Sequence, residues 1–209
     1  MAIPVPYLIS GASRRGPRAA ALMALMAITL CGCSFDLASW SAPEKEAPAK
    51  AAAPAETGGD DARIHTARGQ ALARSGKAEE ALAEYDKAIM LDPHHAEALY
   101  SRGLAYQSQR QHQLAIADFG SANGLTPQRA EPLLARAISY LAMEKLNEAA
   151  ADLDEAAQAD PQNAQIWTTR GIAYERLGDK AKASASYGRA VAIRPKHEAA
   201  RSGLARVGG

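Results

Sequence analysis

The chain has 209 residues, and its 24 Lys and Arg nearly balance its 23 Asp and Glu, for a formal net charge of +1. We therefore expect no nucleic-acid binding, because that function needs a strongly basic surface. The two cysteines, Cys31 and Cys33, both lie near the start, which excludes a disulfide framework for the rest of the chain.

Residues 1–33 have the composition of an export signal. Three arginines and no acidic residue precede an apolar run over 19–30. A basic segment followed by such a run is typical of a secretory signal peptide. The run has 12 residues, too few for a helix that spans a hydrocarbon core of about 30 Å. The tetrapeptide Leu30-Cys31-Gly32-Cys33 resembles the signal of bacterial lipoproteins.

This resemblance implies that Cys33 is the lipidated first residue of the mature chain. Ser34 follows it, where Asp would indicate retention in the inner membrane, so the periplasmic side of the outer membrane is favoured. An ordinary cleaved signal, which would leave a soluble periplasmic protein, remains an alternative. An uncleaved anchor is a further alternative. So is a wrongly assigned start codon, in which case the protein would be a cytosolic interaction module.

Residues 34–61 are rich in Ala, Pro, Glu and Lys and show no apolar periodicity. Such a segment buries too little apolar surface to fold. We predict that 34–61 is a disordered tether between the signal and the folded part.

Four prolines then stand 34 residues apart, at Pro93, Pro127, Pro161 and Pro195. A fixed period of about 20–50 residues indicates an array of repeats that bury their apolar faces against one another. The units are 62–95, 96–129, 130–163 and 164–197, and positions are counted here from the first residue of each. Positions 8 and 20 are small in every unit, position 24 is large, and position 27 is Ala.

This pattern predicts two antiparallel helices in each unit. The small residues let the two backbones approach, and the large residue fills the space beside them. The proline ends the second helix, because it has no N–H to donate and excludes helical geometry from the residue before it. Residues 198–209 are expected to form a short capping helix and tail.

The segments "SRGLAYQSQRQHQLAIADFGSANGLTP" and "TTRGIAYERLGDKAKASASYGRAVAIRP" resemble tetratricopeptide (TPR) repeats, and the resemblance extends over 62–197. It implies an all-α solenoid of four helix-turn-helix units. It also implies that the first helix of each unit lines a concave groove through positions 2, 5, 9, 12 and 13, where protein or peptide partners bind.

On that assignment the middle of the groove is apolar. Exposed apolar strips usually mark binding sites, so a bound peptide should use apolar anchors. TPR domains that hold acidic chaperone C-termini carry Lys and Asn at positions 5 and 9, which no unit here does. Alternatively, the position-9 side chains pack against the neighbouring helix. The candidate partner-binding residues are Tyr100, Leu104, Leu134, Ile138, Leu141 and Ile172.

Position 7 is Arg in every unit, whereas position 23 is acidic in the first three units and Ser186 in the fourth. A fifth unit would place Leu204 at position 7, so Ser186 needs no charge if each acid pairs with the arginine of the next unit. Pairing within a unit, and a ligand-binding row of four arginines, are alternatives. The expected structural ion pairs are Glu84–Arg102, Asp118–Arg136 and Asp152–Arg170.

No catalytic motif is visible, and the histidines lack the spacing and the cysteine partners of a metal site. We therefore predict no enzymatic activity, no metal and no cofactor. The function expected is that of a lipid-anchored scaffold of the cell envelope that binds partner proteins. A self-assembling, homodimeric structural protein is the alternative from a different class.

Overall fold

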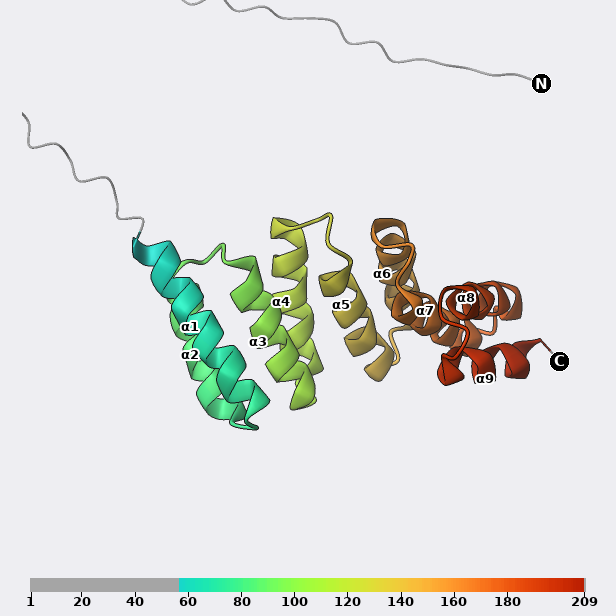
Figure 1. Ribbon diagram of the computed structural model, residues 1–209, viewed down its shortest axis with the longest axis horizontal. Coiled ribbons are helices and arrows are strands. Elements are labelled where there is room, and N and C mark those ends of the chain that lie inside the picture. The colour runs from blue at the N-terminus through green and yellow to red at the C-terminus, as the bar shows by residue number, and fades with distance from the viewer. Residues whose placement is uncertain (1–56, 209) are drawn as a thin grey trace, which may run out of the picture. The chain divides into compact units, whose positions relative to one another are not determined.

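The computed structural model describes residues 57–208, and within that range it contains nine α-helices and no strand. Figure 1 shows the helices following one another as antiparallel pairs, with one further helix at the end. The expected all-α solenoid of four helix-turn-helix units plus a capping helix is confirmed. The helices are α1 (Thr57–Arg74), α2 (Ala78–Leu91), α3 (Ala96–Ser108), α4 (His112–Leu125), α5 (Ala130–Ala142), α6 (Leu146–Ala159), α7 (Ala164–Arg176), α8 (Lys180–Ile193) and α9 (Glu198–Val207).

The first helix begins earlier than the repeat pattern predicts. The composition of 34–61 predicts that residues 57–61 belong to the tether, but they form the start of α1. Asp60 lies in the first turn, where a negative charge stabilises the helix N-terminus. Its carboxylate also accepts a hydrogen bond from Arg63 Nη1 at 3.2 Å. The helical array therefore begins at Thr57 rather than at residue 62.

Each second helix ends two residues before the repeated proline. The helix α2 ends at Leu91, and Asp92 then adopts an extended backbone (φ −138°, ψ 95°) before Pro93. The proline imposes this geometry on the residue before it. The helices α4, α6 and α8 end in the same way, at Leu125, Ala159 and Ile193.

The turn between the two helices of a unit places its position-15 residue at positive φ. This residue is Gly76 in the first unit (φ 80°) and Gly178 in the fourth (φ 81°). In the middle units it is Arg110 (φ 61°) and Glu144 (φ 59°). Left-handed backbone is easy for glycine but costs other residues about 1–2 kcal/mol. The two middle turns therefore carry strain that the outer turns avoid.

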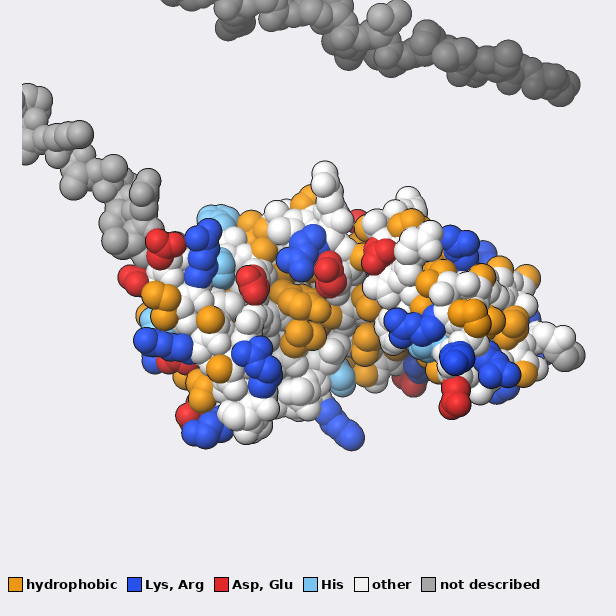
Figure 2. All heavy atoms as spheres, viewed as in Figure 1, with side chains coloured by type: hydrophobic (Ala, Val, Ile, Leu, Met, Phe, Trp, Pro, Cys, Tyr) orange, Lys and Arg blue, Asp and Glu red, His pale blue; other side chains and the backbone are white. Residues whose placement is uncertain are grey.

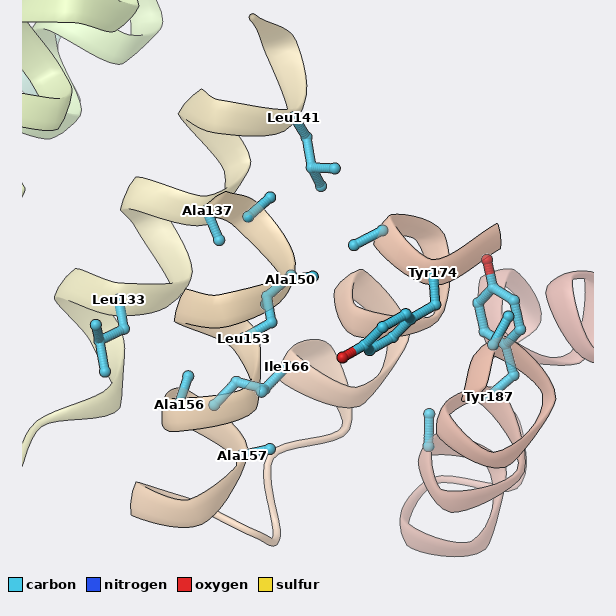
Figure 3. Close-up of a cluster of buried hydrophobic side chains, with 14 of the residues drawn as sticks. Leu133, Ala137, Leu141, Ala150, Leu153, Ala156, Ala157, Ile166, Tyr174 and Tyr187 are labelled. Carbon is cyan, nitrogen blue, oxygen red and sulfur yellow. The ribbon is translucent and has the colours of Figure 1, made fainter. Parts of the chain in front are cut away.

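Within each unit the paired helices touch where a small residue faces a large one. A Cβ atom added to Gly103 of α3 would lie 2.6 Å from Cε1 of Phe119 of α4, which is fully buried. The third unit instead has Ala137 and Leu153, both fully buried in a cluster that runs from α5 to α9 (Figure 3). The smaller side chain at position 24 of this unit is thus compensated by a larger one at position 8, and the helix pair stays closely packed.

Candidate functional site

The first helices of the units expose a row of aliphatic side chains at position 9. Leu104 of α3 is 39% exposed, and Ile138 of α5 and Ile172 of α7 are each 37% exposed. Figure 2 shows hydrophobic side chains gathered near the middle of one face, over α3 to α5, with charged side chains beside them. We refer to Leu104, Ile138 and Ile172 as the position-9 row. Because each keeps more than a third of its surface in solvent, the row is open to a ligand.

A pocket of about 610 Å³ lies beside Leu104, mainly between α1 and α3. Its apolar part comes from Leu104, Tyr100 and the buried ring of Tyr85, and its rim carries the cations Arg74 and Arg129. Apolar surface surrounded by a few polar groups is the usual composition of a ligand site. The remaining lining residues are Gln70, Ala73, Glu97, Ser101, Ala105 and Ser108.

Hydrogen bonds between α1 and α3 hold this pocket in shape. Gln70 Nε2 donates to Glu97 Oε1 at 3.0 Å and to Ser101 Oγ at 3.3 Å. The Tyr100 ring packs against Phe119, with ring centroids 5.7 Å apart. Burial, aided by the negative charge of Glu131, raises the pKa of Tyr100, so its hydroxyl stays neutral and can donate a hydrogen bond to a ligand.

The predicted groove residues divide into three groups. Tyr100 and Leu104 line the pocket, whereas Ile138 and Ile172 continue the exposed row. Leu134 is half-buried and packs against the core. Leu141 is only 8% exposed, so its assignment to the groove is wrong.

Leu141 is buried because α7 covers it. It belongs to the same apolar cluster as Ala173 and Tyr174 of α7. Arg176 of α7 also donates from Nη1 to the Leu141 carbonyl oxygen at 2.9 Å. Position 12 of the third unit therefore serves packing between units and is not open to a partner.

Sequence reasoning missed Arg129 on the pocket rim. This residue is the last of the second unit and precedes α5, so it lies outside the groove positions of the repeat pattern. Arg129 contacts Glu131 through Nη2 and Oε1 at 3.3 Å, and this hydrogen-bonded partner raises its pKa. A charged residue in a turn has no periodic signal by which it could be recognised.

In the two middle units the arginine at position 7 pairs with the position-23 acid of its own unit, not with that of the preceding unit as expected. Arg102 donates from Nε and Nη2 to both oxygens of Asp118, at 2.8 and 2.7 Å. Arg136 binds Asp152 in the same way, at 2.7 and 2.8 Å. Positions 7 and 23 therefore face each other across one helix pair, and these two-pronged bonds raise the pKa of both arginines.

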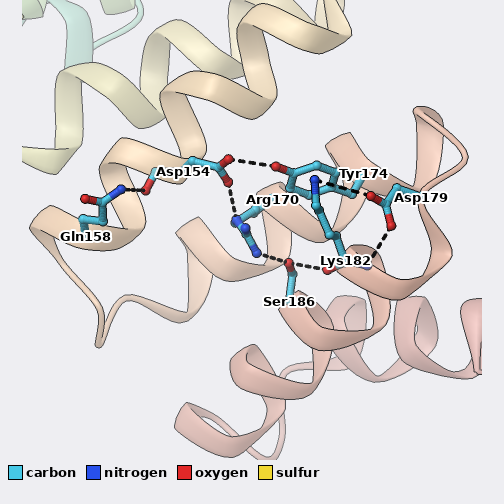
Figure 4. A network of polar contacts seen from close by, with 7 residues as sticks. All are labelled: Asp154, Gln158, Arg170, Tyr174, Asp179, Lys182 and Ser186. Atoms are coloured by element: carbon cyan, nitrogen blue, oxygen red, sulfur yellow. Dashed lines mark hydrogen bonds and ion pairs between the residues drawn. The ribbon is translucent and has the colours of Figure 1, made fainter.

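The contact to the preceding unit comes from position 25 instead. Arg102 Nη1 also binds Asp86 of α2 at 2.7 Å. In the fourth unit, Arg170 Nε binds Asp154 of α6 at 2.6 Å and Nη1 donates to Ser186 at 2.7 Å (Figure 4). The expected pairs Glu84–Arg102, Asp118–Arg136 and Asp152–Arg170 are thus wrong. Glu84 instead binds His65 and Lys87, at 2.7 and 2.6 Å.

Within 57–208, no group of three or more His, Cys, Asp or Glu side chains is placed to hold a metal ion. The same range has no helix with the length and apolar character needed to cross a bilayer. Cys33, the expected lipidation site, lies outside the described residues.

Three family models match the chain, two of them over overlapping segments. A model described as TPR repeat matches residues 69–110, and two described as tetratricopeptide repeat match 96–129 and 134–207. The array is made of tetratricopeptide repeats. TPR proteins generally act as protein-interaction scaffolds and are typically non-catalytic.

Several solved TPR structures share this fold. A MamA protein matches with a TM-score of 0.67 and 21% identity, covering 71% of this chain and 81% of that one. Pseudomonas aeruginosa pilF matches with a TM-score of 0.66 and 18% identity, covering 73% and 69%. The first TPR domain of Spaghetti (RPAP3), bound to the HSP90 peptide SRMEEVD, matches with a TM-score of 0.56 and 22% identity, covering 57% and 95%. At these identities the likeness concerns the fold alone, and no curated protein matches the sequence.

Proposed function

We propose that this protein is a non-catalytic scaffold that binds segments of partner proteins along the face carrying the position-9 row. The observation that carries the proposal is the juxtaposition of three exposed aliphatic side chains, one per unit, with the pocket beside Leu104. Exposed apolar surface of this kind is costly to leave in water, and a partner's apolar side chains would cover it.

The chemistry of the face defines the ligand. The pocket offers apolar surface from Tyr100 and Leu104, with cationic groups from Arg74 and Arg129 at its rim. A peptide with an aliphatic or aromatic anchor in this pocket, and further aliphatic residues over Ile138 and Ile172, fits the surface. The Spaghetti domain with its HSP90 peptide supports peptide binding by this fold.

We further propose that the scaffold is tethered to the cell envelope through lipid on Cys33, facing the periplasm from the outer membrane. The support is the sequence of residues 1–34, with its basic start, apolar run and Leu30-Cys31-Gly32-Cys33. Membrane fractionation of the wild-type protein and a Cys33→Ser variant tests this. Movement of the variant to the soluble fraction supports the anchor, and identical fractionation of the two proteins contradicts it.

Quantitative affinity capture tests the binding face. We compare the wild-type protein with Leu104→Asp and with a control, Leu114→Asp, which changes a leucine that is 50% exposed on α4 and does not line the pocket. The proposal predicts partners that are lost with Leu104→Asp and retained with Leu114→Asp. Equal capture by all three proteins would place partner binding elsewhere.

A further inference from the structure

Within residues 57–208, the first helix of the array has one face that no neighbouring helix covers. Ile64, Arg68 and Ala71 of α1 occupy positions 3, 7 and 10 of their unit, a spacing that places them on one side of the helix. Ile64 is 48% exposed, and Arg68 and Ala71 are also exposed. We call these three residues the α1 end face.

The fourth unit carries the same three residue types at the same positions, Ile166, Arg170 and Ala173 of α7. There the face is closed, because Ile166 and Ala173 are fully buried. The covering helix is α6, which contributes Ala150 and Ala157 to the same apolar cluster (Figure 3). Asp154 lies between these two alanines in α6, at the spacing that matches the α7 face. Asp154 Oδ1 accepts from Arg170 Nε at 2.6 Å (Figure 4).

The second unit repeats this arrangement. Its face on α3 is Ala98, Arg102 and Ala105, of which Ala98 and Ala105 are buried against side chains that include Ile89 and Leu82 of α2. An aspartate lies between those two residues in α2, and this Asp86 binds Arg102 at 2.7 Å. The faces of α3 and α7 are thus covered in the same way, by a helix with an aspartate between two small or aliphatic residues.

Among the helices that the structure describes, none covers the α1 end face in this way. Arg68 has no ion-pair partner within residues 57–208, since Glu84, at position 23 of its own unit, binds His65 and Lys87 instead. The second helices of the array are already engaged, with α2 on α3, α4 on α5, α6 on α7 and α8 on α9. A second copy of the array therefore has no free helix of this kind to offer.

We propose that the α1 end face is a docking site for an amphipathic α-helix of a partner protein. This helix presents an aspartate to Arg68 and carries a small or aliphatic residue four positions before the aspartate and another three positions after it. The partner helix would lie on α1 as α6 lies on α7. This site goes beyond the proposed function, because it uses a different surface from the position-9 row and a helical rather than an extended ligand.

A peptide that copies residues 145–160 is the probe, because it contains the whole of α6 with Asp154. Isolated helices of this length are unstable in water. The peptide is therefore held helical by a lactam bridge between Glu155 and a lysine introduced by Ala151→Lys, both at exposed positions of α6. Its helicity is verified by circular dichroism. Binding of the labelled peptide to the full-length chain is measured by fluorescence anisotropy, with Arg68→Ala, Arg68→Lys and Leu104→Asp variants and a peptide with Asp154→Asn.

The proposal predicts that Arg68→Ala and the Asp154→Asn peptide each weaken binding by about fivefold or more, because each removes the charged hydrogen bond. Arg68→Lys should retain part of the affinity. Leu104→Asp should bind normally, and so should Arg189→Ala, which removes an exposed cation from α8. No binding by the helical peptide at about 1 mM, or binding that is insensitive to Arg68→Ala, overturns the proposal. Binding that is lost with Leu104→Asp overturns it too, since the peptide would then occupy the other face.

Discussion

Because a small and a large residue share one space inside each unit, we predict that Gly103→Ala lowers stability in the wild-type protein and raises it in a variant with a smaller residue at position 119. Gly103 lies against the Phe119 ring, whereas the third unit uses Ala137 with Leu153. The changes to make are Gly103→Ala, Phe119→Leu, and both together. The double variant gives the second unit the pair that the third unit already has.

The magnitudes follow from the packing. The new Cβ would lie 2.6 Å from Cε1 of Phe119, and such overpacking costs about 1–3 kcal/mol, more than the gain of up to about 1 kcal/mol in helix propensity. We therefore expect Gly103→Ala to destabilise the otherwise wild-type chain by about 1 kcal/mol. Phe119→Leu alone opens a void beside a glycine and should cost about 1–2 kcal/mol. In that background Gly103→Ala fills the void and should stabilise by up to about 1 kcal/mol.

Urea unfolding of the four proteins, followed by far-ultraviolet circular dichroism, measures these differences as shifts of the transition midpoint. The predicted coupling between the two sites is about 1–2 kcal/mol, well outside the error for independent sites. Equal effects of Gly103→Ala in both backgrounds would refute the claim that the two positions share one volume.

Three further predictions concern single sites. Arg110→Gly should stabilise the protein by about 0.5 kcal/mol and so raise its urea midpoint. The reason is that Arg110 has a left-handed backbone in a turn where two other units use glycine. Gly120→Asp should stabilise the array more than Gly120→Ala in the same assay. Gly120 occupies position 25 near Arg136 Nη1, so an aspartate there would supply the contact that Asp86 gives Arg102. Equal stabilisation by the two substitutions would refute this prediction. Glu175 hydrogen-bonds to Arg206 of the capping helix and to Tyr187, which lowers its pKa to about 2. Its stabilising contribution is therefore present above the unfolded-state pKa of about 4.3 and lost as the pH falls towards 2, so thermal unfolding of Glu175→Gln between pH 5 and 2 should lose less stability than wild type.

The helical architecture was predictable because its signals recur with the period of the repeat. The prolines predict where α2, α4, α6 and α8 end, since the physical effect of proline is local and the same in each unit. The early start of α1 was not predictable, because residues 57–61 precede the repeated pattern and their helix depends on the turn that follows.

The ion pairs were harder to predict for a different reason. A period shows that Arg102 and Asp118 recur together, but it does not show whether two recurring residues meet within a unit or across the boundary. The sequence did contain the contact between units, in Asp86 and Asp154 at position 25, but Gly120 interrupts that pattern in the unit between them. The burial of Leu141 could not be predicted either, because it depends on how α7 packs against α5.

The central claim is that partner proteins bind on the position-9 row, and site-specific photocrosslinking tests it most directly. A photoreactive amino acid is placed at position 104, 138 or 172 in the row, or at position 114 on α4 as a control that is more exposed than any residue of the row, in the protein expressed in its own cells. We predict that the three row positions crosslink to the same partner and that position 114 does not. Crosslinks from position 114 alone, or equal crosslinking from all four positions, would contradict the account.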